Sequence, residues 1–191
     1  MTDRQATPPG RLVPTVQRAL EAGLPAVQLR EKDLAARALL ALAEELRELT
    51  AAYGALLFVN DRVDVAVAVG ADGVHLGGDS MPVDDVRRLL PPAALVGVST
   101  HDPDELRGCT ADFAFFGPVF DTPAKRPFGP PQGLERLRAA VLAASIPVLA
   151  VGGIGVDTAA AARASGAHGI AVIRAILAAG DPGAATRALL A

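Results

Sequence analysis

The sequence predicts an α/β fold with a parallel sheet, specifically a (β/α)8 TIM barrel with a short or truncated first strand. Three observations lead to this prediction. Strand-type apolar runs alternate with helical segments, and a similar turn recurs where a helix leads into a strand. Seven strands and about eight helices also fit better in a closed barrel than in an open sheet. At 191 residues the chain suits one core, so we expect a single domain over residues 1–191.

Seven apolar runs have the composition of strands that are buried on both faces of a parallel sheet. These predicted strands are Ala26–Arg30, Leu56–Asn60, Gly73–Leu76, Leu95–Ser99, Phe113–Gly117, Pro147–Val151 and Gly169–Ile173. The clearest helix is Leu34–Tyr53, in which leucines recur at helical spacing. The other predicted helices are Val83–Leu90, Gly133–Ala144, Val156–Ser165 and Asp181–Ala191. Asp102 and Asp181 are typical of helix starts.

A weak internal repeat supports the strand–helix alternation. Its copies are Ala22–Val27, Val69–Val74, Ser165–Ile170 and, in part, Thr110–Phe113. In each copy a helix ends near a glycine and a short turn enters the next strand. The count is one strand short for a barrel of eight, because Met1–Gly10 is polar and proline-rich. The first strand is therefore expected to be short or missing.

Composition excludes several classes of protein. The formal net charge is −3 and no basic block is present, which argues against nucleic acid and anionic membranes as partners. No apolar run is long enough to span a membrane, and the first residues do not resemble a signal peptide. The lone Cys109 provides neither a disulfide framework nor a cysteine metal site. We expect a cytoplasmic protein.

Polar residues gather where the predicted strands end. In a parallel barrel these ends meet at one mouth, where binding and catalytic groups lie. The candidates there are Gln28, Arg30, Lys32, Asn60, Asp61, His75, Asp79, Ser80, Ser99, Thr100, His101, Thr122, Lys125, Gly152, Gly153, Ile173 and Arg174. The chain has only two lysines, Lys32 and Lys125, and both fall in this set, although chance placement on a solvated surface would also allow that. No nucleophile–base pair is present, so the set suits an anionic substrate and a divalent cation better than a hydrolytic triad.

Two features indicate phosphate and metal binding. The glycine-rich turn at Gly152 and Gly153 follows a strand and opens a helix, next in order to Ile173 and Arg174, as in the phosphate sites of such barrels. Asp61 and Asp79 are candidate Mg²⁺ ligands, since Mg²⁺ takes one or two carboxylates together with substrate phosphates.

Each of these assignments has a plainer alternative. Asp61 and Ser99 can be helix N-caps, His75 can be a core histidine, and the glycines can simply form a tight turn. The segment Lys125–Gly133 is rich in proline and glycine, so we expect no regular structure and a mobile lid there.

Together, seven strings resemble the thiamine phosphate synthase/TenI family. They are Val27–Lys32, Val59–Arg62, Gly70–Gly77, Gly97–His101, Phe116–Lys125, Ala150–Ile154 and Gly166–Val172, in the order of the family's motifs. The family's opening, an apolar strand that ends in Thr-Asp, is reduced here to Thr2-Asp3. The resemblance implies a transferase that joins hydroxymethylpyrimidine diphosphate to hydroxyethylthiazole phosphate and releases pyrophosphate. It also implies that the chain can form a homodimer.

The resemblance implies a role for each site residue. The pyrimidine diphosphate would be held by Gln28, Arg30, Lys32 and Asn60. Asp61 would bind Mg²⁺, with Asp79 as the second candidate ligand, and Ser99 would bond the polar edge of the pyrimidine. The thiazole phosphate and the leaving group would be taken up by Thr122, Lys125, Gly153, Ile173 and Arg174. Of these residues, Arg30, Lys32, Lys125 and Ser99 would be catalytic.

The chain departs from the family pattern at three places. Ser80 stands at the matching place of the second metal-binding Asp, Ala124 replaces a phosphate-binding hydroxyl, and Arg174 replaces a small hydroxyl residue. Two alternatives follow, a TenI-type thiazole tautomerase and a phosphate-binding barrel without activity. The tautomerase motif carries a histidine at the position of Pro118, so His101 would have to serve as acid and base instead.

Overall fold

The computed structural model describes residues 1–123 and 125–191. The chain divides into two compact units. Unit 1 comprises Met1–His75, Asp84–Leu95 and Ile173–Ala191, and unit 2 comprises Leu76–Val83 and Val96–Val172. Leu76, Val83 and Leu95 each lie at the end of an element whose other residues belong to the other unit. Both units consist of parallel strands and helices, which confirms the α/β class.

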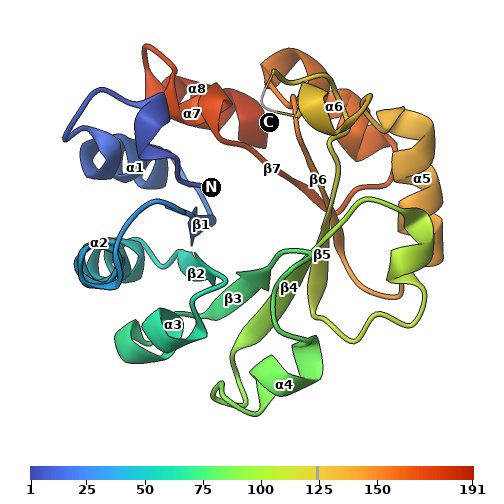
Figure 1. Ribbon diagram of the computed structural model, residues 1–191. Coiled ribbons are helices and arrows are strands. Elements are labelled where there is room, and N and C mark those ends of the chain that lie inside the picture. The colour runs from blue at the N-terminus through green and yellow to red at the C-terminus, as the bar shows by residue number, and fades with distance from the viewer. Residues whose placement is uncertain (124) are drawn as a thin grey trace. The chain divides into compact units, whose positions relative to one another are not determined.

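Unit 1 contains three parallel strands that neighbour one another in chain order (Figure 1). The strands are β1 (Ala26–Leu29), β2 (Leu56–Asn60) and β3 (Gly73–Leu76). The helices of this unit are η1 (Arg4–Ala6), α1 (Leu12–Glu21), α2 (Ala36–Ala52), α3 (Val63–Val69), α4 (Val83–Arg87), α7 (Arg174–Leu177) and α8 (Pro182–Leu190).

Unit 2 contains four parallel strands, again neighbours in chain order. They are β4 (Leu95–Thr100), β5 (Phe113–Phe116), β6 (Val148–Val151) and β7 (Gly169–Ala171). Its helices are η2 (Pro103–Leu106), η3 (Arg126–Phe128), α5 (Gly133–Ala143) and α6 (Val156–Ala164).

The sequence pattern explains why the helices form where they do. The buried residues of α1 recur at helical spacing, which gives this helix an apolar face: Leu12, Val16, Ala19 and Leu20. Helix α8 begins at Asp181, whose side chain accepts hydrogen bonds from the N–H groups of Gly183 and Ala184. The expectation that Asp181 starts a helix is therefore confirmed.

The internal repeat has a physical meaning in the structure. Asp72 donates its N–H to the Leu57 carbonyl (2.9 Å) and accepts the Leu57 N–H on its carboxylate (2.7 Å). Asp112 makes the same pair of bonds with Val96, at 2.8 and 2.7 Å. His168, in the third copy, supplies a backbone bond of 2.8 Å but has no carboxylate. Each aspartate thus ties the start of one strand to the strand before it.

All seven predicted strands are present; β2 and β3 have the predicted bounds, and the ends of the other five shift by one or two residues. The predicted helices are present too, although α4 ends at Arg87, earlier than expected. Asp102 does cap a helix, but this helix is the 3₁₀ turn η2. The expectation of no regular structure in Lys125–Gly133 is wrong in part, because η3 lies within that segment.

None of the helices within the described residues is long and apolar enough to cross a membrane.

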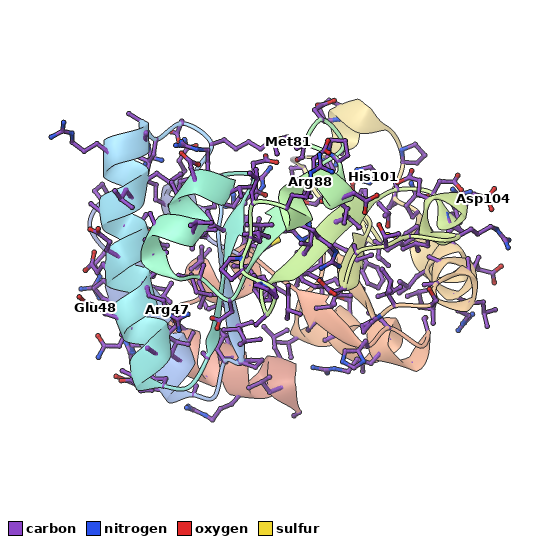
Figure 2. All side chains as sticks on the ribbon, turned by 90° about the horizontal axis from the view of Figure 1, so that it is seen from below. Arg47, Glu48, Met81, Arg88, His101 and Asp104 are labelled. Atoms are coloured by element: carbon purple, nitrogen blue, oxygen red, sulfur yellow. The ribbon has the colours of Figure 1, made fainter. Side chains whose placement is uncertain are left out.

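We expect Asp72→Ala to lower the free energy of unfolding by about 2 kcal/mol. The substitution leaves the buried Leu57 N–H without its acceptor and removes the partner of Arg47, which reaches Asp72 from α2 at 2.7 Å (Figure 2). Urea denaturation measures the change. The matched control is Asp85→Ala, because the exposed ion pair of Asp85 with Arg88 should contribute less than about 0.5 kcal/mol. Equal losses in both variants would contradict the tie to Leu57.

Candidate active site

The carboxyl ends of the strands in unit 1 bring several predicted site residues together. In the parallel register Leu29 pairs with Val59, and Asn60 pairs with His75. Asp61 then donates its N–H to the His75 carbonyl at 3.0 Å. Residues that are far apart in the sequence therefore share one edge of the sheet, as the sequence predicts.

A directed hydrogen-bond chain crosses this edge. The Gln28 amide donates to the Asn60 side-chain oxygen (3.2 Å), and the Asn60 amide donates to the Asp61 carboxylate (2.9 Å). An ionised carboxylate can only accept, so Asp61 fixes the orientation of both amides. The Gln28 oxygen, on a side chain only 6% exposed, has no hydrogen-bond partner among residues 1–123 and 125–191. A buried acceptor of this kind fits a ligand that donates an N–H.

Asp61 has an unusual backbone for a residue with a side chain. Its φ is 60°, in the left-handed region that aspartate tolerates better than most residues. Helix α3 begins two residues later, after the N-cap residue Arg62, and its start carries no side-chain cap. The N-cap alternative for Asp61 is therefore wrong, and its exposed carboxylate remains a candidate ligand for a cation.

His75 is buried at this edge, in agreement with its interpretation as a core histidine. Burial lowers its pKa to about 4, and the Arg30 charge acts in the same direction while the Asp61 charge opposes it. The imidazole is therefore neutral at physiological pH.

Lys32 and Arg30 provide positive charge beside this edge. Arg30 is half-buried and Lys32 is exposed. Neither has an ion-pair partner within the part of the chain that the structure describes. Both cations are therefore available to an anionic ligand.

In unit 2, the end of β4 carries Ser99, Thr100 and His101. Ser99 lies inside the strand and is half-buried, so it is not a helix N-cap. The Thr100 hydroxyl donates to the Phe115 carbonyl at 3.1 Å. The Nδ1 atom of His101 lies 2.5 Å from the Gly117 carbonyl, which can only accept, so Nδ1 carries a proton, while Nε2 makes no hydrogen bond among the described residues.

The glycine-rich turn of unit 2 packs closely against the segment after β5. Phe120 donates its N–H to the Gly152 carbonyl at 3.0 Å. Gly153 has a φ of 64°, and a Cβ atom there would lie 2.6 Å from the Asp121 carbonyl. A side chain at Gly153 would therefore need both a strained backbone and a displaced neighbour. The close approach of two backbones explains why glycine is required.

The segment that carries Thr122 and Lys125 is closed by an ion pair. The Arg126 guanidinium binds the Asp121 carboxylate through Nε and Nη2, and these bonds hold the pKa of Asp121 below its usual value. The Lys125 N–H donates to the Thr122 carbonyl at 2.9 Å. Ala124, where a hydroxyl was expected to be lost, lies outside the described residues.

The turn after β3 explains what Ser80 does. The Gly77 N–H donates to the Ser80 hydroxyl (2.6 Å), and the Ser80 N–H donates to the Gly77 carbonyl (3.2 Å). Ser80 thus shapes the turn through its hydroxyl, while Asp79 is exposed beside it. No group of three or more His, Cys, Asp or Glu residues that could hold a metal exists among the described residues.

Ile173 and Arg174 belong to unit 1, whereas Gly153 belongs to unit 2. Ile173 is the N-cap of the short helix α7, and Arg174 is its exposed first residue. Their predicted role in phosphate binding stays a prediction.

Comparisons with known proteins identify the family of this chain. The model of the thiamine monophosphate synthase family matches residues 1–176. The chain belongs to this family. A thiamine-phosphate synthase of Roseiflexus castenholzii is 48% identical over 192 residues, 99% of this chain and 84% of the relative. A putative thiamine-phosphate synthase of Geobacter sulfurreducens is 47% identical over 194 residues, covering 100% of this chain and 91% of that protein.

The structure of a thiamine phosphate pyrophosphorylase from Pyrococcus furiosus is also similar. It matches with a TM-score of 0.90 and 40% identity, over 99% of this chain and 91% of the other. The predicted membership of the thiamine phosphate synthase/TenI family is thereby confirmed.

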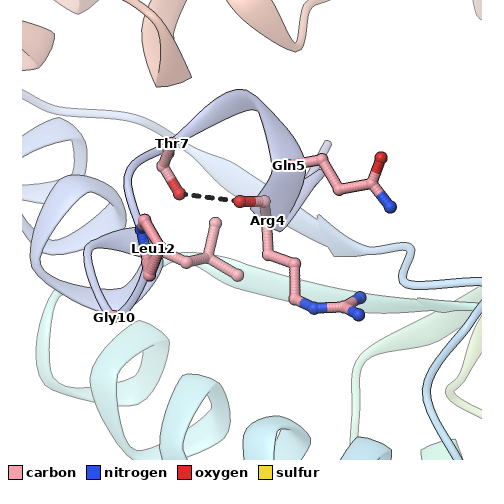
Figure 3. A pocket seen from close by; sticks show the side chains of 6 residues that line it. Arg4, Gln5, Thr7, Gly10 and Leu12 are labelled. Carbon is pink, nitrogen blue, oxygen red and sulfur yellow. Dashed lines mark hydrogen bonds between the residues drawn. The ribbon is translucent and has the colours of Figure 1, made fainter.

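Sequence reasoning missed the contacts that hold residues 30–33 in place. Arg4 binds Glu31 and Asp33, and it also lines a pocket of about 490 Å³ (Figure 3). The other lining residues are Gln5, Thr7, Pro9, Gly10 and Leu12. The sequence has no local pattern that predicts these contacts, because Arg4 lies 27 and 29 residues before Glu31 and Asp33.

We expect the neutral state of His75 to make stability depend on pH. Its folded-state pKa of about 4 lies below the ordinary histidine pKa of 6.5, so between these values the unfolded chain binds more protons than the folded one. The free energy of unfolding should therefore fall as pH falls from 6.5 towards 4. Urea titrations of His75→Gln should show a shallower fall. The exposed His168→Gln serves as control, and the same slope in all three proteins would contradict the assignment.

Proposed function

We propose that this chain is a thiamine-phosphate synthase, which joins hydroxymethylpyrimidine diphosphate to hydroxyethylthiazole phosphate and releases pyrophosphate. One observation carries the proposal furthest. The directed chain from Asp61 through Asn60 leaves the buried Gln28 oxygen as an acceptor, beside two cations without ion-pair partners among the described residues. An ionised phosphate cannot donate a hydrogen bond, so the Gln28 oxygen suits an N–H on the pyrimidine, and Arg30 and Lys32 suit its diphosphate.

The chemistry needs no protein nucleophile. When the C–O bond to the diphosphate breaks, negative charge grows on the leaving group and positive charge on the pyrimidine. Arg30 and Lys32 stabilise the leaving group where its charge develops. The thiazole nitrogen then attacks the pyrimidine cation, so positioning of the substrates replaces covalent catalysis. Ser99 is proposed to bond the polar edge of the pyrimidine.

The thiazole phosphate is proposed to bind the second group of residues. Lys125 supplies a cation, Thr122 a hydroxyl, and the backbone at Gly153, Ile173 and Arg174 supplies N–H donors. Support comes from the tight backbone at Gly153, which leaves no room for a side chain. The closed ion pair of Asp121 with Arg126 holds the intervening segment.

Mg²⁺ is proposed as the cofactor. The exposed Asp61 carboxylate fits the ion's preference for oxygen ligands, with Asp79 as the second candidate and diphosphate oxygens completing the shell. When bound, Mg²⁺ would neutralise charge on the diphosphate. The Asn60 amide, on one oxygen of Asp61, keeps that carboxylate oriented.

Further proposals concern the complete fold, the cellular location and the oligomeric state. The complete fold is proposed to be a (β/α)8 barrel whose first strand is reduced to Thr2 and its neighbours. Thr2 supports this, because its N–H donates to the Gln28 carbonyl (2.8 Å) as a strand residue would. The protein is also proposed to act in the cytoplasm as a homodimer, without a nucleic-acid partner.

Thiazole tautomerisation is the second candidate, favoured by one observation. The His101 imidazole bonds the Gly117 carbonyl, next to Pro118, where the tautomerase motif carries a histidine. Its open Nε2 could take a proton from a bound thiazole.

Pyrophosphate release tests the choice between these functions. With both precursors and Mg²⁺, we expect release that requires each substrate. Lys32→Ala should lower kcat/KM about 100-fold, because the leaving group loses a charge-assisted bond. Binding of thiazole phosphate, measured by calorimetry, should stay unchanged. Isomerisation of thiazole phosphate without pyrophosphate release, abolished by His101→Gln, would instead establish the tautomerase. Binding without turnover would leave a binding protein.

The dependence of activity on Mg²⁺ concentration distinguishes the roles of Asp61 and Asp79. We expect Asp61→Asn to raise the Mg²⁺ concentration for half-maximal activity about tenfold, because a carboxylate ligand becomes a weaker amide while the residue still tolerates a left-handed backbone. Asp79→Asn should have a smaller effect if it is an outer ligand. Calorimetric titration of Mg²⁺ in the presence of pyrophosphate provides a second measurement. Unchanged titrations in both variants would remove Mg²⁺ from the proposal.

A further inference from the structure

The N-terminal residues 2–4 are hydrogen-bonded to residues 28–33, the motif that carries the proposed diphosphate-binding residues. Thr2 donates its N–H to the Gln28 carbonyl (2.8 Å), and its hydroxyl accepts the Arg30 N–H (2.9 Å). Arg4 then donates its N–H to both oxygens of Glu31, at 3.1 and 3.2 Å. Thr2 is only 1% exposed, so this contact is part of the core. The conformation of residues 28–31 therefore depends on residues 2–4.

The Arg4 side chain binds two acids of the same motif. Its Nη1 atom lies 3.3 Å from Glu31 and 2.5 Å from Asp33, and its Nη2 atom lies 2.7 Å from the other oxygen of Asp33. The Glu31 side chain is 3% exposed, whereas that of Asp33 is 51% exposed. These bonds hold the pKa of Asp33 below its usual value and keep it ionised. With its donors on two carboxylates, Arg4 is committed to the motif and not to a ligand.

Unlike the two acids, the two bases of the motif are not held by an ion pair among the described residues. Arg30 and Lys32 alternate with Glu31 and Asp33 in the sequence, yet the described residues include no ion-pair partner for either base. Glu31 and Asp33 are the carboxylates adjacent to these bases in the sequence, and without Arg4 they would lack their ion-pair partner. Pairing with them would neutralise the charge that an anionic ligand needs. Arg4 thus separates the acids from the bases.

We propose that Arg4 is a positioning residue that holds Glu31 and Asp33 and so keeps Arg30 and Lys32 available to the diphosphate of the substrate. This inference rests on the proposed function. Arginine suits the role because its planar fork can bind two carboxylates at once, which the point charge of lysine cannot do. The effect on catalysis is indirect, through the two bases.

Binding of inorganic pyrophosphate with Mg²⁺ tests the inference directly, by calorimetry on the whole chain. Arg4→Met should raise the Kd for pyrophosphate and the KM for pyrimidine diphosphate about tenfold, and Arg4→Lys should give an intermediate value. The KM for thiazole phosphate should change by less than about twofold. The control is Arg88→Met, which breaks an exposed arginine–aspartate pair in the same unit (Figure 2) and should leave all three constants unchanged.

A second substitution distinguishes charge separation from simple loss of structure. In the double variant Arg4→Met/Asp33→Asn, the competing acid is removed, so pyrophosphate binding should recover about threefold over Arg4→Met alone. A merely structural Arg4 would give no recovery and would weaken both substrates equally. Either of these results, or an unchanged Kd in Arg4→Met, would overturn the inference.

Failure of the proposed function would be visible separately. In that case the wild-type protein would release no pyrophosphate from the two precursors. The calorimetric comparison of wild type, Arg4→Met and the double variant would still decide whether Arg4 governs diphosphate binding.

Discussion

The parallel register of the strands is the constraint on which the site in unit 1 depends. Because Leu29 pairs with Val59 and Asn60 pairs with His75, the carboxyl ends of β1, β2 and β3 lie on one edge. A shift of one residue would turn each side chain to the opposite face of the sheet. Gln28 would then no longer reach Asn60. The aspartate ties protect this register, since Asp72 binds Leu57 through both backbone and carboxylate.

The direction of the hydrogen bonds then determines how the side chains at this edge are oriented. The Asp61 carboxylate can only accept, and this one fact orients Asn60 and then Gln28. The left-handed backbone of Asp61 has a cost, roughly 1 kcal/mol, that the surrounding structure must offset. Its carboxylate is exposed at the strand end and does not cap α3. A strained backbone at a position that does not cap a helix is compatible with the proposed role of Asp61 as a ligand for a cation.

The sequence predicts the strands well because burial on both faces leaves a local trace. Each strand is a short apolar run, so its position is read from composition alone. The strand ends then predict Gln28, Asn60 and Asp61 as neighbours. Short helices leave a weaker trace, which is why α7, a single turn, was not expected. The contacts of Arg4 could not be predicted in this way, because 27 and 29 residues separate it from Glu31 and Asp33. A long-range ion pair leaves no repeating pattern in the sequence from which it could be predicted.

The burial of Glu31 makes the charge of residues 30–33 depend on the N-terminal segment that binds it. A carboxylate that is 3% exposed and lacks a counter-charge would cost several kcal/mol. It would leave the core or turn to a neighbouring base, and the latter would form a new ion pair. The nearest bases in the sequence are Arg30 and Lys32, so such an ion pair would neutralise the cations that are proposed to bind substrate. Because the Arg4 backbone and guanidinium both bind Glu31, the segment that extends the sheet edge also maintains the positive charge of the motif. Folding of the N-terminal segment and electrostatic preorganisation of the site are therefore consequences of the same few bonds.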